Sequence, residues 1–329
     1  MKPFISALGP MMARYVTLKQ ALGRGFAEPC AVLHSLDQYL VVGRMADLTA
    51  DTFAAWSTTL SHLMPGVRRR RFETIRNFCL YRRRTDAACY VPDPALFPVR
   101  HRPVHPYVFT DADIIRVLVA AKKLERTDGS PLRPDVFRLV VVLLYTTGIR
   151  RGELTRFSVG DYDRRDATLL VRESKFHKSR YVPLSSDGVH EIEHYLQVRR
   201  AHRQPAAPES PLLWNRYAGG RTYTGTGVRE GLRSLFRMAH VHKPDGTLPR
   251  VHDFRHGFAI RALLRWYEAG EDLHAKLPLL ATYMGHVSIV STAHYLPFIE
   301  PLAAAASARF AQRCGGLITA SPEPAGGAS

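Results

Sequence analysis

The segment PDVFRLVVVLLYTT, residues 134–147, is an almost uninterrupted apolar stretch. Its apolar side chains would fall on most sides of a helix rather than on one stripe, which is typical of a helix surrounded by protein. Pro134 suits the first turn, because proline lacks the N–H group that a helix start leaves unpaired. The segment therefore predicts the central helix of a domain, against which neighbouring elements pack.

Helical and strand-like segments flank this central helix. Thr110 and the acidic residues after it predict a capped helix over residues 111–119. Strand-like patterns appear at 168–171 and 180–184, with a polar turn between them. Helical periodicity returns after Gly188. We therefore expect a mostly helical domain that carries a small antiparallel β-sheet.

The N-terminal part of the chain predicts a small helical domain of its own. Apolar residues recur there at helical spacing, and the stretch 67–84 alternates apolar residues with arginines. Five prolines in the next stretch are typical of an extended linker, and the small residues at the end of the chain are typical of disorder. The expected order is a helical domain, a linker, a catalytic domain and a disordered tail, over residues 1–90, 91–107, 108–314 and 315–329.

The chain is strongly basic. Its 329 residues include 46 Lys and Arg against 29 Asp and Glu, a formal net charge of +17. Such an excess favours a polyanionic partner, because basic side chains that neutralise phosphates release condensed counterions. A generally basic protein or a membrane-surface binder is the alternative that charge alone leaves open.

Other compositional features narrow the class of protein. The four cysteines form no CxxC pair, so we expect neither a zinc site nor a disulfide framework. No apolar run reaches the roughly 18 residues of a membrane span, and no signal-peptide pattern opens the chain. We therefore expect a cytoplasmic protein without a membrane partner.

Six residues after the central helix could together cleave a phosphodiester. Two guanidiniums can hold the non-bridging oxygens, and a phenol can attack the phosphorus once a histidine takes its proton. A lysine can protonate the leaving oxygen. No acidic cluster predicts two-metal chemistry and no P-loop predicts nucleotide use, so no cofactor is expected. The residues are Arg150, Lys175, His252, Arg255, His286 and Tyr295.

In this order, the six residues resemble the catalytic set of the tyrosine recombinases, the phage integrase family. The shared motifs are GIRRGEL at 148–154, HDFRH at 252–256 and MGH at 284–286, followed by Tyr295. The resemblance covers the chain from Thr147 to Tyr295. It implies a mainly α fold in which a small SAM-like core-binding domain precedes the catalytic domain.

The resemblance also assigns roles. Arg150 and Arg255 would clamp the phosphate, and His286 would donate a hydrogen bond to it. His252 would take the proton of Tyr295, which would form a 3′-phosphotyrosine. The strand lysine, Lys175, would protonate the 5′ oxygen.

Several residues compete for these roles. Lys178 and His177 are alternatives to Lys175, and Tyr283 is an alternative nucleophile. His256 is expected to be a buried structural histidine. Glu153 is expected to support the site rather than to take part in the chemistry.

Nine basic side chains are expected to contact DNA, most of them in the 67–84 stretch. A solvated charged face is the alternative for that stretch. The residues are Arg68, Arg69, Arg70, Arg71, Arg76, Arg82, Arg83, Lys178 and Arg180.

The function that follows from the resemblance is site-specific recombination or integration by the enzyme of a mobile element. Two domains would clamp double-stranded DNA, and a homotetramer would act on two DNA sites. An apolar helix after Pro301 would dock in a neighbouring protomer or fold back on its own domain. A type IB topoisomerase and an inactive DNA-binding architectural protein are the alternative functions.

Overall fold

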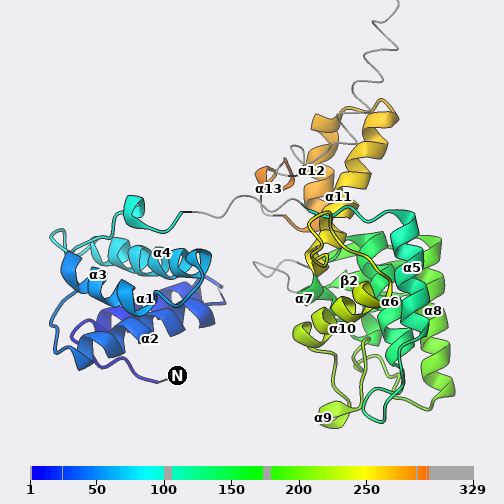
Figure 1. The fold of residues 1–329 in the computed structure, drawn as a ribbon, viewed down its shortest axis with the longest axis horizontal. Helices are drawn as coiled ribbons and strands as arrows, with labels where there is room; N and C mark the ends of the chain where they lie inside the picture. The colour runs from blue at the N-terminus through cyan, green and yellow to red at the C-terminus, as the bar shows by residue number, and fades with distance from the viewer. Residues whose placement is uncertain are drawn as a thin grey trace, which may run out of the picture. The chain divides into compact units, whose positions relative to one another are not determined.

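The chain forms two units, each with its own buried apolar cluster, and the two are described separately (Figure 1). The units are Met1–Val104 and His105–Ser329. Their boundary falls within the proline-rich 91–107 stretch. The structure is a computed structural model that describes residues 2–23, 25–99, 106–172, 179–286, 288–293 and 295.

The N-terminal unit is helical, as the sequence predicts. Helix α4 packs against both α1 and α2 around a core that contains Trp56, Ile75 and Phe78. Thr49 caps α3, because its hydroxyl accepts the backbone N–H of Thr52. The elements are α1 Gly9–Ala21, α2 Ala27–Val42, α3 Ala50–Thr59, α4 Pro65–Arg82 and the 3-10 turn η1 Pro94–Leu96.

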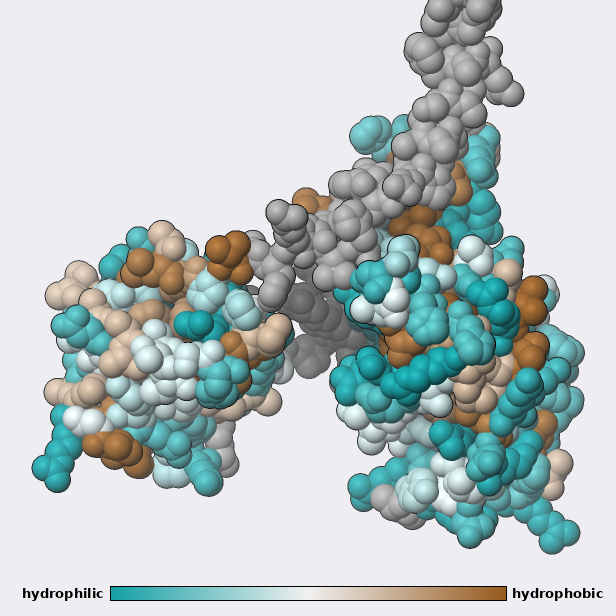
Figure 2. All heavy atoms as spheres, in the orientation of Figure 1, coloured by the Kyte–Doolittle hydropathy of each residue, from teal (hydrophilic) through white to brown (hydrophobic). Residues whose placement is uncertain are grey.

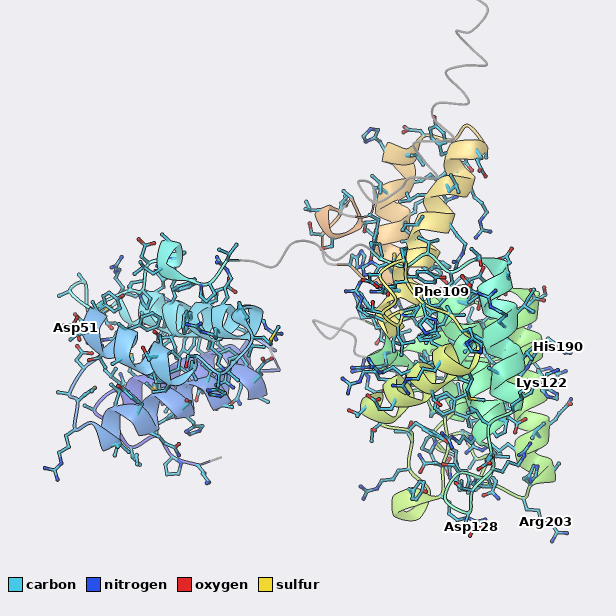
Figure 3. The ribbon with its side chains drawn as sticks, in the orientation of Figure 1. Asp51, Phe109, Lys122, Asp128, His190 and Arg203 are labelled. Carbon is cyan, nitrogen blue, oxygen red and sulfur yellow. The ribbon has the colours of Figure 1, made fainter. Side chains whose placement is uncertain are left out.

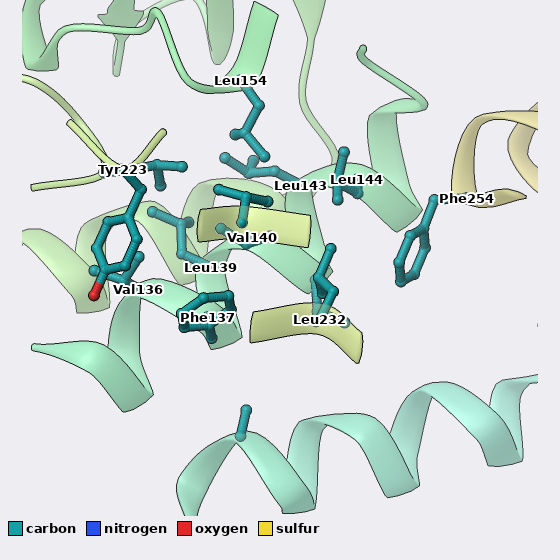
Figure 4. Packing of buried hydrophobic residues seen from close by; sticks show 14 of the residues in the cluster. Val136, Phe137, Leu139, Val140, Leu143, Leu144, Leu154, Tyr223, Leu232 and Phe254 are labelled. Atoms are coloured by element: carbon teal, nitrogen blue, oxygen red, sulfur yellow. The ribbon is translucent and has the colours of Figure 1, made fainter. Parts of the chain in front are cut away.

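The predicted central helix is α6, Arg133–Thr147, and it is buried along most of its length. Its neighbours are α5 Asp111–Lys122, α8 Ser186–Ala201, α10 Gly225–Met238 and α11 Val251–Glu268. Figure 4 shows Leu139, Val140 and Leu143 of α6 among the packed side chains. Thr110 caps the start of α5, as expected, and does so in a capping box with Asp113. The helix prediction for this region is confirmed.

A small antiparallel sheet lies beside these helices. Its order is β1-β2-β3, and Leu169 of β2 pairs with Val182 of β3. The two longer strands are those expected, whereas the two-residue strand β1 is too short for a pattern in the sequence to reveal. The remaining elements here are α7 Arg151–Leu154, η2 Val159–Asp161, β1 Tyr162–Asp163, β2 Thr168–Val171, β3 Arg180–Pro183 and α9 Tyr217–Gly220. The expected fold class, mainly α with a small antiparallel sheet, is confirmed.

Farther along the second unit, α11 and α12 Leu273–Met284 share an apolar cluster with Tyr295, and the four-residue helix α13 Val290–Ala293 precedes that tyrosine. Phe109, labelled in Figure 3, stacks on Phe254 of α11 with ring centroids 4.3 Å apart. Hydrophilic residues cover much of the face of this unit in Figure 2, with apolar side chains scattered between them. Within the described ranges, no helix has both the length and the apolarity needed to cross a membrane.

Candidate active site

Arg150 is placed by a sharp turn at the end of α6. Gly148 takes a left-handed conformation there, with φ +61°, and a Cβ on it would lie 2.7 Å from the ring of Phe258. Glycine is therefore required at this turn. The turn buries Ile149 and makes Arg150 the N-cap of α7, where its backbone N–H donates to Glu153 at 3.0 Å.

Glu153 joins two guanidiniums in the buried part of the site. Its Oε1 accepts from Arg150 at 2.7 Å, and Arg180 donates to both of its oxygens, at 3.1 and 2.9 Å. Burial alone would raise the pKa of Glu153, but the hydrogen bonds and charges of the two arginines lower it to about 2. Glu153 is therefore ionised at neutral pH and links Arg150 to Arg180.

Three arginines donate to three successive carbonyls at the end of α12. Arg180 donates to the carbonyl of Tyr283 at 2.7 Å, and Arg150 donates to that of Gly285 at 2.8 Å. Arg255 donates to the carbonyl between them, that of Met284. The last carbonyls of a helix have no partner within the helix and form the negative end of its dipole. This helix end therefore holds all three guanidiniums in one place.

Arg255 lies one turn into α11, close to its capped start. Arg250 and Asp253 form a capping box there, and Asp253 is completely buried. Arg255 is itself buried and also donates to the carbonyl of Gly148 at 2.9 Å. Burial and the nearby charge of Arg150 lower its pKa to about 10, so the guanidinium stays charged at neutral pH.

Tyr295 lies in this site. It is only 4% exposed, although its neighbour α13 has already ended at Ala293, so the tyrosine follows the short helix rather than lying within it. Its ring centroid is 5.2 Å from that of His256 and 6.0 Å from that of His286. Burial raises the pKa of the phenol, while the charge of Arg255 and its hydrogen bond to the phenol act in the opposite direction.

Three histidines surround the tyrosine and the arginines. His252 has a solvent-exposed edge, yet the surrounding protein and the charge of Arg255 lower its pKa. Burial lowers the pKa of His286 to about 4, and its Nδ1 lies 2.8 Å from the hydroxyl of Thr292. Burial also lowers the pKa of His256 to about 4, and its buried Nδ1 has no hydrogen-bond partner among the described residues. All three rings are therefore neutral at pH 7.

The competing tyrosine has a different environment. The ring of Tyr283 stacks on Phe258 with centroids 5.2 Å apart, and burial raises its pKa to about 12. These contacts are those of a packed side chain. Lys175, Lys178 and His177 lie outside the described residues, as do the expected helix after Pro301 and the C-terminal tail.

The basic residues of α4 fall into two groups. Arg69 donates to the carbonyl of Pro98 at 2.8 Å, and Arg76 donates to that of Pro92 at 2.5 Å. Arg82 pairs with Asp47 and Asp86. The side chains of these three arginines are therefore already bound by carbonyls and carboxylates of the N-terminal unit. Among the described residues, no such contact to a carbonyl or carboxylate is seen for Arg68, Arg70 and Arg71 of α4 or for Arg83 directly after it, and Arg70 and Arg83 are exposed.

A basic cavity of about 460 Å³ adjoins Arg150 and His252, and none of the sequence motifs pointed to the two arginines that α10 contributes to it. Arg229 and Arg233 of α10 line it, and they are four residues apart on one helix face. Two arginines four residues apart, on a helix whose opposite face is apolar, are the sequence signal that could have predicted this basic helix face. Arg151 and Arg250 complete the basic lining.

Comparisons with known proteins agree with this geometry. The model of the phage integrase family matches residues 115–297. A Sinorhizobium fredii protein assigned as an integrase/recombinase, y4rB, is 32% identical over 294 residues, which are 89% of this chain and 93% of that protein. The tyrosine recombinase XerD of Bradyrhizobium diazoefficiens is 29% identical over 85% of this chain and 81% of its own.

Solved structures show the same fold at low sequence identity. One is the XerH site-specific recombinase in a post-cleavage complex with a palindromic difH substrate. It superposes with a TM-score of 0.62 and is 17% identical in sequence. The match covers 84% of this chain and 77% of the XerH chain. A lambda integrase dimer bound to a COC' core site superposes with a TM-score of 0.56 at 16% identity. The match covers 88% of this chain and 76% of the lambda integrase chain.

Proposed function

The chain belongs to the phage integrase family, and from that premise we propose that it is a tyrosine recombinase that cleaves and rejoins DNA strands at specific sites. The observation that carries the proposal is the meeting of Tyr295 with Arg255 and Arg150. A phenol lies beside two guanidiniums whose positions are fixed by the carbonyls of Gly285, Met284 and Gly148. A phosphodiester is the substrate that needs this combination, because two positive donors match its non-bridging oxygens.

The proposed cleavage step exchanges one phosphate ester for another. The phenolic oxygen of Tyr295 attacks the phosphorus and forms the 3′-phosphotyrosine, while the bond from phosphorus to the 5′ oxygen breaks. His252 takes the phenolic proton, which is consistent with an imidazole kept neutral by its lowered pKa. The 5′ oxygen receives a proton from Lys175. Rejoining reverses these steps with the 5′ hydroxyl of a partner strand, and the ester energy is retained throughout.

Double-stranded DNA is the proposed partner. The charge of +17 supports it, as does the basic cavity beside Arg150. The XerH structure is described as bound to a palindromic difH substrate, and the lambda integrase dimer as bound to a COC' core site. We extend the proposal to a homotetramer that joins two DNA sites, as the family resemblance implies. A type IB topoisomerase would act on one duplex only, and the family match favours recombination.

The test is covalent trapping on nicked duplex DNA. A nick close to the cleavage point lets the short 5′-hydroxyl product diffuse away, so that the phosphotyrosyl adduct cannot be reversed. The wild-type chain is incubated with a pool of nicked duplexes of random sequence, and adducts that survive denaturation are isolated and sequenced. Adducts that share a sequence support the proposal. If no sequence in the pool yields an adduct, the chain is not a recombinase.

A further inference from the structure

We propose that Arg180 is a positioning residue of the phosphate site and not a DNA contact: it neutralises Glu153, which leaves the positive charge of Arg150 uncompensated and its guanidinium oriented for the phosphate. The inference rests on the proposed function and adds a residue to its site. Arg180 is the first residue of β3, paired across the sheet with Val171. It is 27 residues from Glu153 and 103 from Tyr283 in the chain, yet it contacts both.

The hydrogen bonds of Arg180 are directed inward. Its side chain is 12% exposed, its Nη1 and Nη2 donate to Glu153, and its Nε donates to the carbonyl of Tyr283. A guanidinium has five N–H donors in a rigid plane, and here all three nitrogens face acceptors of the protein. Arg150 is more open, with 28% of its side chain exposed. The two arginines that share Glu153 therefore differ: one is enclosed, and the other faces the site.

Charge balance explains why the enclosed arginine matters. Arg150, Arg180 and Arg255 carry three positive charges against the single negative charge of Glu153, so these four side chains have a net charge of +2. Without Arg180 the net charge would be +1, and Glu153 would have Arg150 as its only partner among them. A carboxylate that binds Arg150 alone would compete directly with the phosphate.

Gly285 shows that the space around both arginines is fixed. A Cβ on Gly285 would lie 2.8 Å from Nη1 of Arg180 and 3.4 Å from Nη1 of Arg150, and its φ is +64°. The backbone at the end of α12 therefore lies against the Arg180 guanidinium too closely for a side chain, while Arg150 lies at ordinary contact distance, and the left-handed φ also favours glycine. The positions of the two guanidiniums are thus coupled through one short backbone segment.

The experiment compares Arg180→Met with wild type in two measurements: the single-turnover rate of adduct formation on a nicked duplex, and the affinity for the intact duplex at several salt concentrations. We expect the rate to fall at least about 100-fold while the affinity changes less than about threefold and its salt slope stays the same. Arg180→Lys should recover part of the rate, because a lysine keeps the charge but cannot bridge both oxygens of Glu153.

A double variant tests the charge argument. Adding Glu153→Gln to Arg180→Met removes the unbalanced carboxylate, so the double variant should cleave about tenfold faster than Arg180→Met alone. If the two substitutions instead multiply their losses, Arg180 acts independently of Glu153 and the proposal fails. If Arg180→Met fails to fold, the comparison is made between Arg180→Lys and Arg180→Lys combined with Glu153→Gln.

Arg172 provides a matched control. It lies at the end of the neighbouring strand and also pairs with a buried carboxylate, Asp161, at 2.5 Å. Arg172→Met should cleave within about threefold of wild type. Equal losses in the Arg172 and Arg180 variants, or a weaker affinity and a flatter salt slope for Arg180→Met, would overturn the positioning role.

A further measurement separates this inference from the proposed function. If the wild-type chain forms no adduct, the proposed function fails, but the link to Glu153 can still be measured in acid unfolding. The low pKa of Glu153 stabilises the fold above its unfolded value of about 4.3, and that stabilisation is lost as the pH falls towards 2. Arg180→Met should lose less stability over this interval than wild type. An unchanged pH dependence would overturn the link.

Discussion

At the residue scale, the site depends on one phenol being held beside two guanidiniums. We expect Tyr295→Phe to retain DNA binding within about twofold and to abolish covalent adducts, because the ring contacts with His256 and His286 remain while the nucleophilic oxygen is removed. The measurement is adduct formation on the nicked duplex beside affinity for the intact one. Tyr283→Phe is the control, and a loss of adducts in that variant alone would assign the nucleophile to Tyr283.

The buried histidines predict a dependence of stability on pH. His256 has a pKa of about 4 in the folded chain, below its ordinary value of about 6.5. Its contribution to stability is therefore fully present above pH 6.5 and is lost as the pH falls towards 4. His256→Phe keeps an aromatic ring but cannot be protonated, so its unfolding free energy should fall less over this interval, by about 1–3 kcal/mol.

The measurement is denaturant unfolding of both chains at pH 7 and pH 4.5. His194, an exposed residue of α8, provides the control, and His194→Phe should keep the slope of wild type. Parallel pH profiles for wild type and His256→Phe would show that His256 is not buried in its neutral form.

Some side chains of the candidate site could be predicted from the sequence, and others could not. Arg150, His252, Arg255 and Tyr295 could be identified because short motifs surround them. The contacts of Arg180 could not, because its partners are 27 and 103 residues away and no local pattern records them. The contacts of the last carbonyls of α12 could not be predicted either, because they depend on which arginines pack against that end of the helix.

At the element scale, the packing of α10 against α6 is unusually close. A Cβ on Gly231 would lie 1.9 Å from Cζ of Phe137, a ring in the centre of the core (Figure 4). We expect Gly231→Ala to lower the unfolding free energy by about 1–3 kcal/mol or more, because the ring has no room to move without strain. Denaturant unfolding measures the loss. Gly152→Ala in α7, where nothing lies within 4 Å of the added Cβ, should cause no loss, and equal losses would contradict the packing argument.

The other face of α10 carries a prediction about DNA. Arg229 and Arg233 line the basic cavity beside Arg150 and His252. Replacing both by alanine should weaken binding to all DNA sequences and flatten the salt dependence of affinity by about one unit for each phosphate that is no longer neutralised. Affinity measured from about 50 to 200 mM salt tests this. An unchanged slope would mean that this face of α10 points away from DNA.

The elements themselves were mostly predictable. A nearly continuous apolar stretch revealed α6, and Thr110 with the acidic residues after it marked the start of α5, because both signals are local. The strand β1 was not predictable, since two residues give no alternation to detect. The sequence also could not show which arginines of α4 donate to the carbonyls of Pro92 and Pro98. The prolines predict an extended stretch, but not which side chains contact its carbonyls.

At the scale of the whole molecule, each unit has a separate core. Trp56 is almost completely buried in the core of the N-terminal unit. We expect Trp56→Ala to destabilise that unit by about 3–5 kcal/mol, because it removes a large buried side chain. Amide hydrogen exchange should show faster exchange in α2 and α4 and unchanged protection in α6. Faster exchange in α6 as well would show that the two cores unfold together.

The end of α12 has a consequence for the life of the protein in a cell. Synthesis proceeds from the N-terminus, so the carbonyls of Tyr283, Met284 and Gly285 leave the ribosome after all three arginines that they hold. A nascent or partly unfolded chain lacks these anchors and cannot assemble the phosphate site. The proposed cleavage site therefore forms only after α12 has been made and has folded against the three arginines, so that any strand cleavage waits for the folded unit.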